Sequence, residues 1–172
     1  MNNYTLTGTS TSIVAARISF TFNLLGPAMA LDTACSSSLL AIHLAAQALR
    51  EGDCEMALAG GVNMLMSPDI FVQLSKARMV SPTGYCHAFS SKADGYARGE
   101  GAGILLLKRL TDAVRDNDPI WATIMTGSNQ DGHTVRPMTA PSGSQQFELL
   151  KKVYSRYNID PDRLEYIEAH GM

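Results

Sequence analysis

One cysteine of this sequence lies where a nucleophile would be expected. Residues 28–31 form a short apolar run that predicts a strand, and from Ser36 an apolar rhythm of 3.6 residues predicts a helix that continues to Gly52. Cys35 falls at the turn between the two. Backbone N–H groups at a helix N-terminus lack intrahelical partners and, with the helix dipole, favour the nucleophilic thiolate form of a cysteine. The pattern predicts a nucleophile elbow with cysteine in place of serine, whereas a lone cysteine without this context would be interpreted as a small buried hydrophobe.

The helix that follows the cysteine has almost no polar face. Its apolar residues point in nearly every direction around the helix axis: Leu39, Leu40, Ile42, Leu44, Ala45, Ala48 and Leu49. A helix that is hydrophobic all round is normally buried. We therefore expect a core helix that the rest of the domain covers on all sides.

A histidine close to the last residue is the second candidate. Residues 166–171, YIEAHG, predict a strand that delivers His170 to its end. The other histidines are His43 in the apolar helix and His87 and His133 in predicted loops, and we expect them to be structural or solvated rather than ligands. No CxxC or HxxxH pair indicates a zinc site.

The remaining sequence predicts the elements that would position these residues. We expect helices over 12–22, 67–79, 110–114 and 142–158, and further strands over 55–63, 104–107 and 120–126. Glycines in the strand at 55–63 predict a close approach to a neighbouring backbone. Ser142 and Gln145 form a capping box, and Asn158 can end its helix in a left-handed turn.

A glycine-rich stretch at 89–103 carries four charged side chains close together. Lys92, Asp94, Arg98 and Glu100 fall within nine positions. Long irregular loops are often functional. Two interpretations remain open for this one, a salt-bridged structural loop and a functional loop.

Bulk composition excludes several classes of protein. The 172 residues are 45% hydrophobic and carry a formal charge of −2, which argues against binding to nucleic acid or anionic membranes as the main activity. Neither a secretory leader nor an apolar run long enough for a membrane span is present, so we expect a cytoplasmic protein. Cys35, Cys54 and Cys86 are an odd number at wide spacings, which favours reduced thiols.

The residues around the cysteine resemble a known family. Residues 32–39, DTACSSSL, resemble the active-site signature of β-ketoacyl synthases, the condensing enzymes of polyketide and fatty-acid synthesis, and most closely those of polyketide synthases. Further motifs resemble that family in the expected order: ARISF at 16–20, FSSKADGYARGEG at 89–101, NQDG at 129–132 with TAPS at 139–142, and EAHG at 168–171. The sequence departs from the family pattern at Ala16, Ala28, Ser90 and Met172.

The resemblance implies an α/β fold of the thiolase-like type. This fold has layered αβαβα architecture, and we expect it to be incomplete at both ends of this chain. Residues 1–116 would be the later part of the N-terminal half, which carries the cysteine elbow. Residues 117–172 would open the C-terminal half and end at the first catalytic histidine motif.

The resemblance also implies a reaction and roles for two residues. Cys35 would hold an acyl group as a thioester, and His170 would stabilise the enolate formed when a malonyl-type extender loses carbon dioxide. Both substrates would be carried on the phosphopantetheine of an acyl carrier protein, and no metal or dissociable cofactor would be required. We expect a homodimer in the complete enzyme, formed near residues 26–31.

Two other functions stay open. Family members carry a second catalytic histidine and a lysine beyond the position of Met172, so we expect that the complete site cannot be assembled from these residues alone. The alternative is a catalytically inactive protein with an incomplete thiolase fold, which binds an acyl carrier protein or a ketosynthase subunit. A third possibility is a cysteine hydrolase that uses Cys35 and His170 as a dyad.

Overall fold

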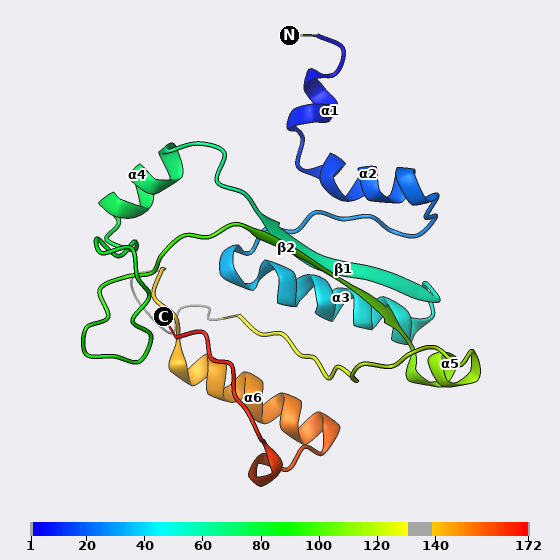
Figure 1. The fold of residues 1–172 in the computed structure, drawn as a ribbon. Coiled ribbons are helices and arrows are strands. Elements are labelled where there is room, and N and C mark those ends of the chain that lie inside the picture. Colours follow the sequence, from blue (N-terminus) through cyan, green and yellow to red (C-terminus); the bar gives the residue numbers. More distant parts are fainter. Residues whose placement is uncertain (1, 131–138, 172) are drawn as a thin grey trace. The chain divides into compact units, whose positions relative to one another are not determined.

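A computed structural model describes residues 2–130 and 139–171 of the chain (Figure 1). The chain forms two compact units. The first comprises residues 1–61 and 104–126, and the second comprises residues 62–103 and 127–172. No helix among the described residues is both long enough and apolar enough to cross a membrane.

The first unit holds the cysteine helix and most of a small sheet. Its helices are α1 (Thr5–Thr9), α2 (Ser12–Phe22), the 3₁₀ turn η1 (Ala34–Ser36), α3 (Ser37–Glu51) and α5 (Leu110–Arg115). Strands β1 (Met56–Asn63) and β2 (Gly101–Lys108) pair in a two-stranded sheet. Figure 1 shows the two strands running in opposite directions. The predicted helices at 12–22, 36–52 and 110–114 and the strands at 55–63 and 104–107 are confirmed.

The start of α3 packs tightly against β1. A Cβ atom built on Gly61 would lie 2.9 Å from Ser38 Cβ, so only glycine lets the strand approach the helix this closely. The close approach predicted from the strand glycines is therefore confirmed. Because Ser38 lies three residues after Cys35, this contact fixes the helix turn that carries the cysteine.

The other end of α3 is capped by glycine and by an arginine. Gly52 adopts the left-handed conformation with φ 84°, which ends the helix where the sequence predicts. Arg109 Nη1 donates hydrogen bonds to Leu49 O at 2.8 Å and to Cys54 O at 2.9 Å. Carbonyl groups that the helix leaves without N–H partners are thus satisfied, and α3 is tied to the segment that follows β2.

The expectation that α3 is covered on all sides is wrong for the described residues. Only His43 and Leu49 of the helix are buried, and Leu39 is 70% exposed. The predicted buried strand at 104–107 is likewise largely exposed, with Leu106 at 66%. These residues are exposed because few elements pack against them. In the described part of this unit, the only sheet beside the helix has two strands.

Three predicted strands are absent from the described structure. Residues 28–31, 120–126 and 166–171 belong to no ladder, because the sheet consists of β1 and β2. A strand is stabilised by hydrogen bonds to a neighbouring strand, and an apolar run alone does not supply them. The cysteine turn therefore follows irregular chain rather than the strand that the sequence predicts.

The second unit contains α4 (Asp69–Lys76), α6 (Gly143–Tyr157) and the 3₁₀ turn η2 (Pro161–Arg163). Ser142 Oγ accepts a hydrogen bond from Gln145 N at 3.3 Å, and Asn158 has φ 52°, so both predicted ends of α6 are confirmed. The predicted helix at 67–79 is shorter than expected and ends at Lys76. Residues 131–133, with the end of the NQDG motif and His133, lie outside the described part of the chain.

Candidate active site

Cys35 lies in the middle of η1, directly before α3. Hydroxyl and carboxylate groups on either side hold this turn. Asp32 Oδ1 accepts a hydrogen bond from Ala34 N at 3.0 Å, and Ser37 Oγ accepts one from Thr33 N at 2.9 Å. The serine hydroxyl also donates to Ala34 O at 2.7 Å. The short polar side chains around the cysteine thus fix its backbone by local hydrogen bonds.

The residue before the cysteine has a strained backbone. Ala34 has φ 57°, in the left-handed region that residues with a Cβ rarely adopt. Such strain is maintained only where the surrounding structure determines the conformation, and it is often found at functional sites. The strain turns the chain abruptly into α3 and leaves Cys35 exposed at the start of the helix. A sharp turn into a helix with an accessible nucleophile matches the turn and the helix of a nucleophile elbow, although residues 28–31 before it form no strand.

His43 lies two turns further along α3 and is buried. Its Nδ1 is 2.9 Å from Thr126 Oγ1, which ties the helix to the segment 120–126 of the same unit. Buried polar groups of this kind are normally satisfied structurally. The contact agrees with the structural role expected from the sequence.

His170 belongs to the second unit, and Cys35 belongs to the first. The histidine is exposed and comes just after Glu168, whose carboxylate accepts a hydrogen bond from the Tyr166 hydroxyl. That hydrogen bond raises the pKa of Tyr166 above its usual value. Gly171 follows His170 with φ 70°, so the chain turns sharply immediately after the histidine.

The charged loop at 89–103 is not held by ion pairs in the described residues. Glu100 Oε1 accepts a hydrogen bond from Leu65 N at 2.7 Å, and Arg98 Nη2 donates to Asn63 Oδ1 at 3.3 Å. Arg98 Nε is buried without a hydrogen-bond partner in the described structure. The salt-bridged interpretation of this loop is therefore wrong for the described residues. Arg98 and Glu100 instead contact polar atoms at the end of β1 and just after it.

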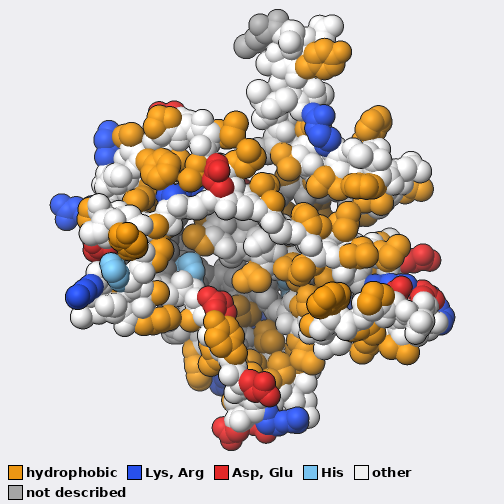
Figure 2. All heavy atoms as spheres, in the orientation of Figure 1, with side chains coloured by type: hydrophobic (Ala, Val, Ile, Leu, Met, Phe, Trp, Pro, Cys, Tyr) orange, Lys and Arg blue, Asp and Glu red, His pale blue; other side chains and the backbone are white. Residues whose placement is uncertain are grey.

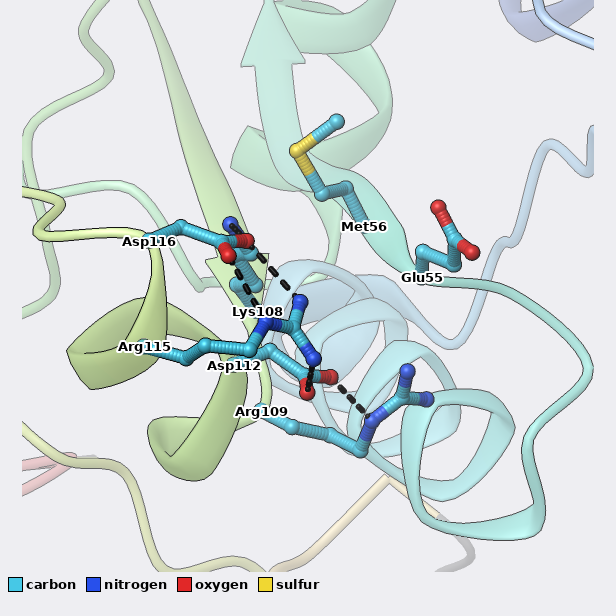
Figure 3. A pocket seen from close by; sticks show the side chains of 7 residues that line it. All are labelled: Glu55, Met56, Lys108, Arg109, Asp112, Arg115 and Asp116. Atoms are coloured by element: carbon cyan, nitrogen blue, oxygen red, sulfur yellow. Dashed lines mark hydrogen bonds and ion pairs between the residues drawn. The ribbon is translucent and has the colours of Figure 1, made fainter.

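A separate pocket of the first unit is lined mainly by charged side chains (Figure 3). It has a volume of about 190 Å³ and is lined by Glu55, Met56, Lys108, Arg109, Asp112, Arg115 and Asp116. Because Arg109 contacts the C-terminal end of α3, the length of that 15-residue helix separates it from Cys35 by about 20 Å. The pocket is therefore distinct from the cysteine site.

Ion pairs dominate the chemistry of this charged pocket. Lys108 Nζ lies 2.6 Å from a carboxylate oxygen of both Asp116 and Asp118, and Arg115 pairs with Asp112 at 2.9 Å and with Asp116 at 2.8 Å. Hydrogen bonds from Arg115 and then Lys108 hold the pKa of Asp116 well below its usual range. Sequence reasoning did not identify the cluster, although the spacing of Asp112 and Arg115 on one helix face indicates part of it.

The described residues contain no group of three or more histidine, cysteine, aspartate or glutamate side chains arranged to hold a metal ion. The expectation that no metal or dissociable cofactor is needed remains a prediction.

Two family models match the chain. Residues 1–113 match the model for the β-ketoacyl synthase N-terminal domain, and residues 122–172 match the model for the β-ketoacyl synthase C-terminal domain. The predicted boundary between residues 116 and 117 stays a prediction.

Several polyketide synthases are similar over almost the whole chain. A phenolphthiocerol/phthiocerol polyketide synthase from Mycobacterium tuberculosis is 46% identical over 99% of the chain, which spans 9% of that protein. The highly reducing polyketide synthase dmxL2 of a Cryptosporiopsis species is 48% identical over 98% of the chain, which spans 7% of that protein. The chain thus corresponds to less than a tenth of these relatives.

Solved structures share the fold. The ketosynthase from module 6 of the bacillaene synthase of Bacillus subtilis 168 matches with a TM-score of 0.92 and 46% identity, over 99% of this chain and 32% of its own. An oxazolomycin ketosynthase domain of Streptomyces albus matches with a TM-score of 0.91 and 42% identity, over 94% of this chain and 29% of its own. The expected α/β, thiolase-like fold class is confirmed, and the chain spans about a third of these ketosynthases.

Proposed function

Because the chain belongs to the β-ketoacyl synthase family, we propose that it carries the acyl-accepting cysteine of a ketosynthase that forms carbon–carbon bonds in polyketide biosynthesis. The observation that supports this most directly is the exposed Cys35 on a strained turn at the start of α3. Similarity to polyketide synthases makes the polyketide pathway a better candidate than fatty-acid synthesis.

In the first stage, the Cys35 thiolate attacks the carbonyl carbon of an acyl thioester on an acyl carrier protein. The new carbon–sulfur bond forms as the bond to the carrier sulfur breaks, and the carrier thiolate leaves and takes up a proton. Covalent catalysis of this kind divides one difficult step into two easier ones. The developing oxyanion needs hydrogen-bond donors, and the Cys35 N–H at the elbow is suited to be one of them.

In the second stage, a malonyl thioester on the carrier protein loses carbon dioxide. The electron pair of the broken carbon–carbon bond forms an enolate, whose carbon attacks the acyl carbon on Cys35. The bond to Cys35 then breaks, which returns the thiolate and releases the extended β-ketoacyl thioester. His170 would donate a hydrogen bond to the malonyl thioester carbonyl and so stabilise the enolate.

The proposed substrates imply two kinds of partner. An acyl carrier protein must deliver both thioesters, and the similar polyketide synthases, of which this chain spans less than a tenth, have room for a carrier domain as that partner. A second copy of the ketosynthase is the other proposed partner, with residues 26–31 near the contact.

The test separates the two stages in the complete protein that carries residues 1–172. Incubation with an acyl carrier thioester should add the acyl mass to the peptide that contains Cys35, and malonyl carrier protein should then release carbon dioxide. Cys35→Ala should abolish acylation and condensation. His170→Ala should retain acylation and lower decarboxylation by about a hundredfold or more, the range typical of a missing polar catalytic group.

Cys86→Ala is the matched control, because Cys86 is also exposed but lies in a loop, where its sulfur accepts a hydrogen bond from Ala97 N. Its acylation should equal that of the unchanged protein. Acylation that persists in Cys35→Ala would contradict the proposal. Release of free acid without condensation would indicate the hydrolase instead, and carrier binding without acylation would indicate the non-catalytic protein.

A further inference from the structure

A turn in the second unit places an aromatic residue in a conformation that glycine usually adopts. Ser90 N donates a hydrogen bond to His87 O at 3.0 Å, which closes a β-turn over residues 87–90. Phe89 is the third residue of that turn and has φ 61°. At this turn position a positive φ favours glycine or asparagine, and a bulky residue there is strained. The presence of a phenylalanine therefore requires an explanation.

Burial in a hydrophobic core does not supply that explanation. The Phe89 side chain is 82% exposed. The backbone bond from Ser90 N to His87 O closes the turn without the ring, and the next residues are held by Ser90 O, which accepts from Ala93 N at 3.1 Å, and Ser90 Oγ, which accepts from Lys92 N at 3.2 Å. The aromatic ring thus contributes neither core packing nor the hydrogen bonds of its own turn.

The ring lies beside the residue that follows the candidate histidine. A Cβ atom built on Gly171 would be 3.7 Å from Phe89 Cζ and 3.9 Å from Phe89 Cε2, and 3.7 Å from Ala88 Cβ. Gly171 itself has φ 70°, so two residues with left-handed backbones meet here. All of these residues belong to the same compact unit as His170.

We infer that Phe89 is a positioning residue that holds the backbone at Gly171, and with it His170, in the orientation needed for malonyl decarboxylation. Ala88 and the Phe89 ring together form a surface against which the sharp bend at Gly171 rests. Such support matters because a catalytic group displaced by about 1 Å can lower a rate by about a hundredfold. The inference rests on the proposed function, since it assigns a support to the histidine of that reaction.

The discriminating variant removes the ring and keeps the turn. Asparagine tolerates the left-handed conformation, so Phe89→Asn should leave the midpoint of thermal unfolding equal to or above that of the unchanged complete protein. Acylation of Cys35 should stay within about twofold, whereas release of carbon dioxide from malonyl carrier protein should fall by at least about tenfold. Phe89→Tyr, which keeps the ring, should decarboxylate as the unchanged protein does.

Phe147→Asn is the matched control. It removes an exposed ring on α6 that is not among the nearest neighbours of Gly171, and it should leave decarboxylation unchanged.

The outcomes separate this inference from the proposed function. If Phe89→Asn acylates normally and decarboxylates within twofold of the unchanged protein, the inference is overturned and the proposed function is not. A complete protein that neither acylates Cys35 nor decarboxylates malonyl thioester would overturn the proposed function, and the inference with it. An independent measurement uses the unchanged 172-residue chain, in which nuclear Overhauser effects between the Phe89 ring protons and the Gly171 α-protons are expected. Their absence in an otherwise assigned spectrum would also overturn the inference.

Discussion

At the residue scale, the cysteine site depends on short polar side chains that form hydrogen bonds with the neighbouring backbone. The side chains of Asp32, Ser36 and Ser37 bond to backbone atoms of residues 33 and 34, and the Thr33 and Ser36 hydroxyls bond to each other. These local bonds offset the strain of an alanine at φ 57°. Polar residues in this run therefore have a mechanical role, which is to turn the chain so that Cys35 points to solvent at the beginning of α3.

The charged pocket provides a prediction about pH at the same scale. Asp116→Asn removes a carboxylate whose pKa is lowered by hydrogen bonds from Arg115 and Lys108. A lowered pKa in the folded state stabilises the fold above the unfolded pKa of about 3.9, and this contribution is lost as pH falls towards the folded value. We expect Asp116→Asn to lower the unfolding midpoint at pH 7 by at most about 3 °C, since exposed ion pairs contribute little. Asp118 still pairs with Lys108 in this variant.

Thermal unfolding at pH 7 and at a pH below about 3 tests this prediction, because the difference between the variant and the unchanged chain should become smaller as the carboxylate of the unfolded chain is protonated. Asp94→Asn is the control, since that carboxylate forms no ion pair in the described residues. A difference between variant and unchanged chain that is the same at both pH values would rule out the ion-pair explanation.

At the element scale, the contact between β1 and α3 determines where the cysteine turn lies. Gly61→Ala should destabilise the chain by about 1–3 kcal/mol, the range found for overpacked cores. The new Cβ would stand 2.9 Å from Ser38 Cβ, and a Cβ attached to a helix backbone cannot move aside as the end of a flexible side chain can. Urea unfolding gives the change in free energy.

Gly103→Ala is the matched control for this prediction. Gly103 lies in β2, and no atom would come within 4 Å of an added Cβ there. Equal stabilities for the two alanine variants would mean that the helix and strand do not pack as described.

Elements with local signals could be predicted from the sequence, and elements that need a distant partner could not. The helix α2 and both ends of α6 follow from apolar periodicity, a capping serine and a left-handed asparagine, all of which are encoded within a few residues. The strands expected at 28–31, 120–126 and 166–171 depend on a neighbouring strand, and the described structure supplies none to them. Apolar composition therefore indicated burial or pairing that these residues do not have.

The same distinction between local and distant signals applies to the residues of the candidate site. Cys35 could be identified because the start of the helical period just after it is a local signal, although the strand expected before it is absent. The support of Gly171 by Phe89 could not, since 82 positions separate the two residues and a positive φ at a phenylalanine has no sequence signature. The family motif indicated that residues 89–101 matter, but not which contact they make.

At the scale of the whole molecule, the chain exposes far more apolar surface than a stable domain normally does. The buried hydrophobic side chains among the described residues are Leu49, Ala59 and Ala113. Figure 2 shows hydrophobic side chains distributed widely over the visible face. Large exposed apolar patches on soluble proteins indicate surfaces that associate with other protein. The proposed second copy of the ketosynthase is one way to cover such surface.

Trp121 allows this expectation to be measured directly. It is the single tryptophan of the sequence and is 98% exposed. In the 172-residue chain at low concentration, its fluorescence should resemble that of tryptophan in water and should be quenched readily by acrylamide. If the chain associates through its apolar surface, raising the concentration should shift the emission to shorter wavelength and reduce quenching, in step with a rise in sedimentation coefficient. Emission that stays water-like while the chain sediments as a single monomer would show that this surface does not drive association.

Two variants of Trp121 serve as controls. The Trp121→Phe variant, which has no tryptophan signal but retains an apolar ring, should sediment as the unchanged chain does. Replacement by a charged residue in Trp121→Glu should weaken association, because a carboxylate cannot be buried in an apolar contact without loss of hydration.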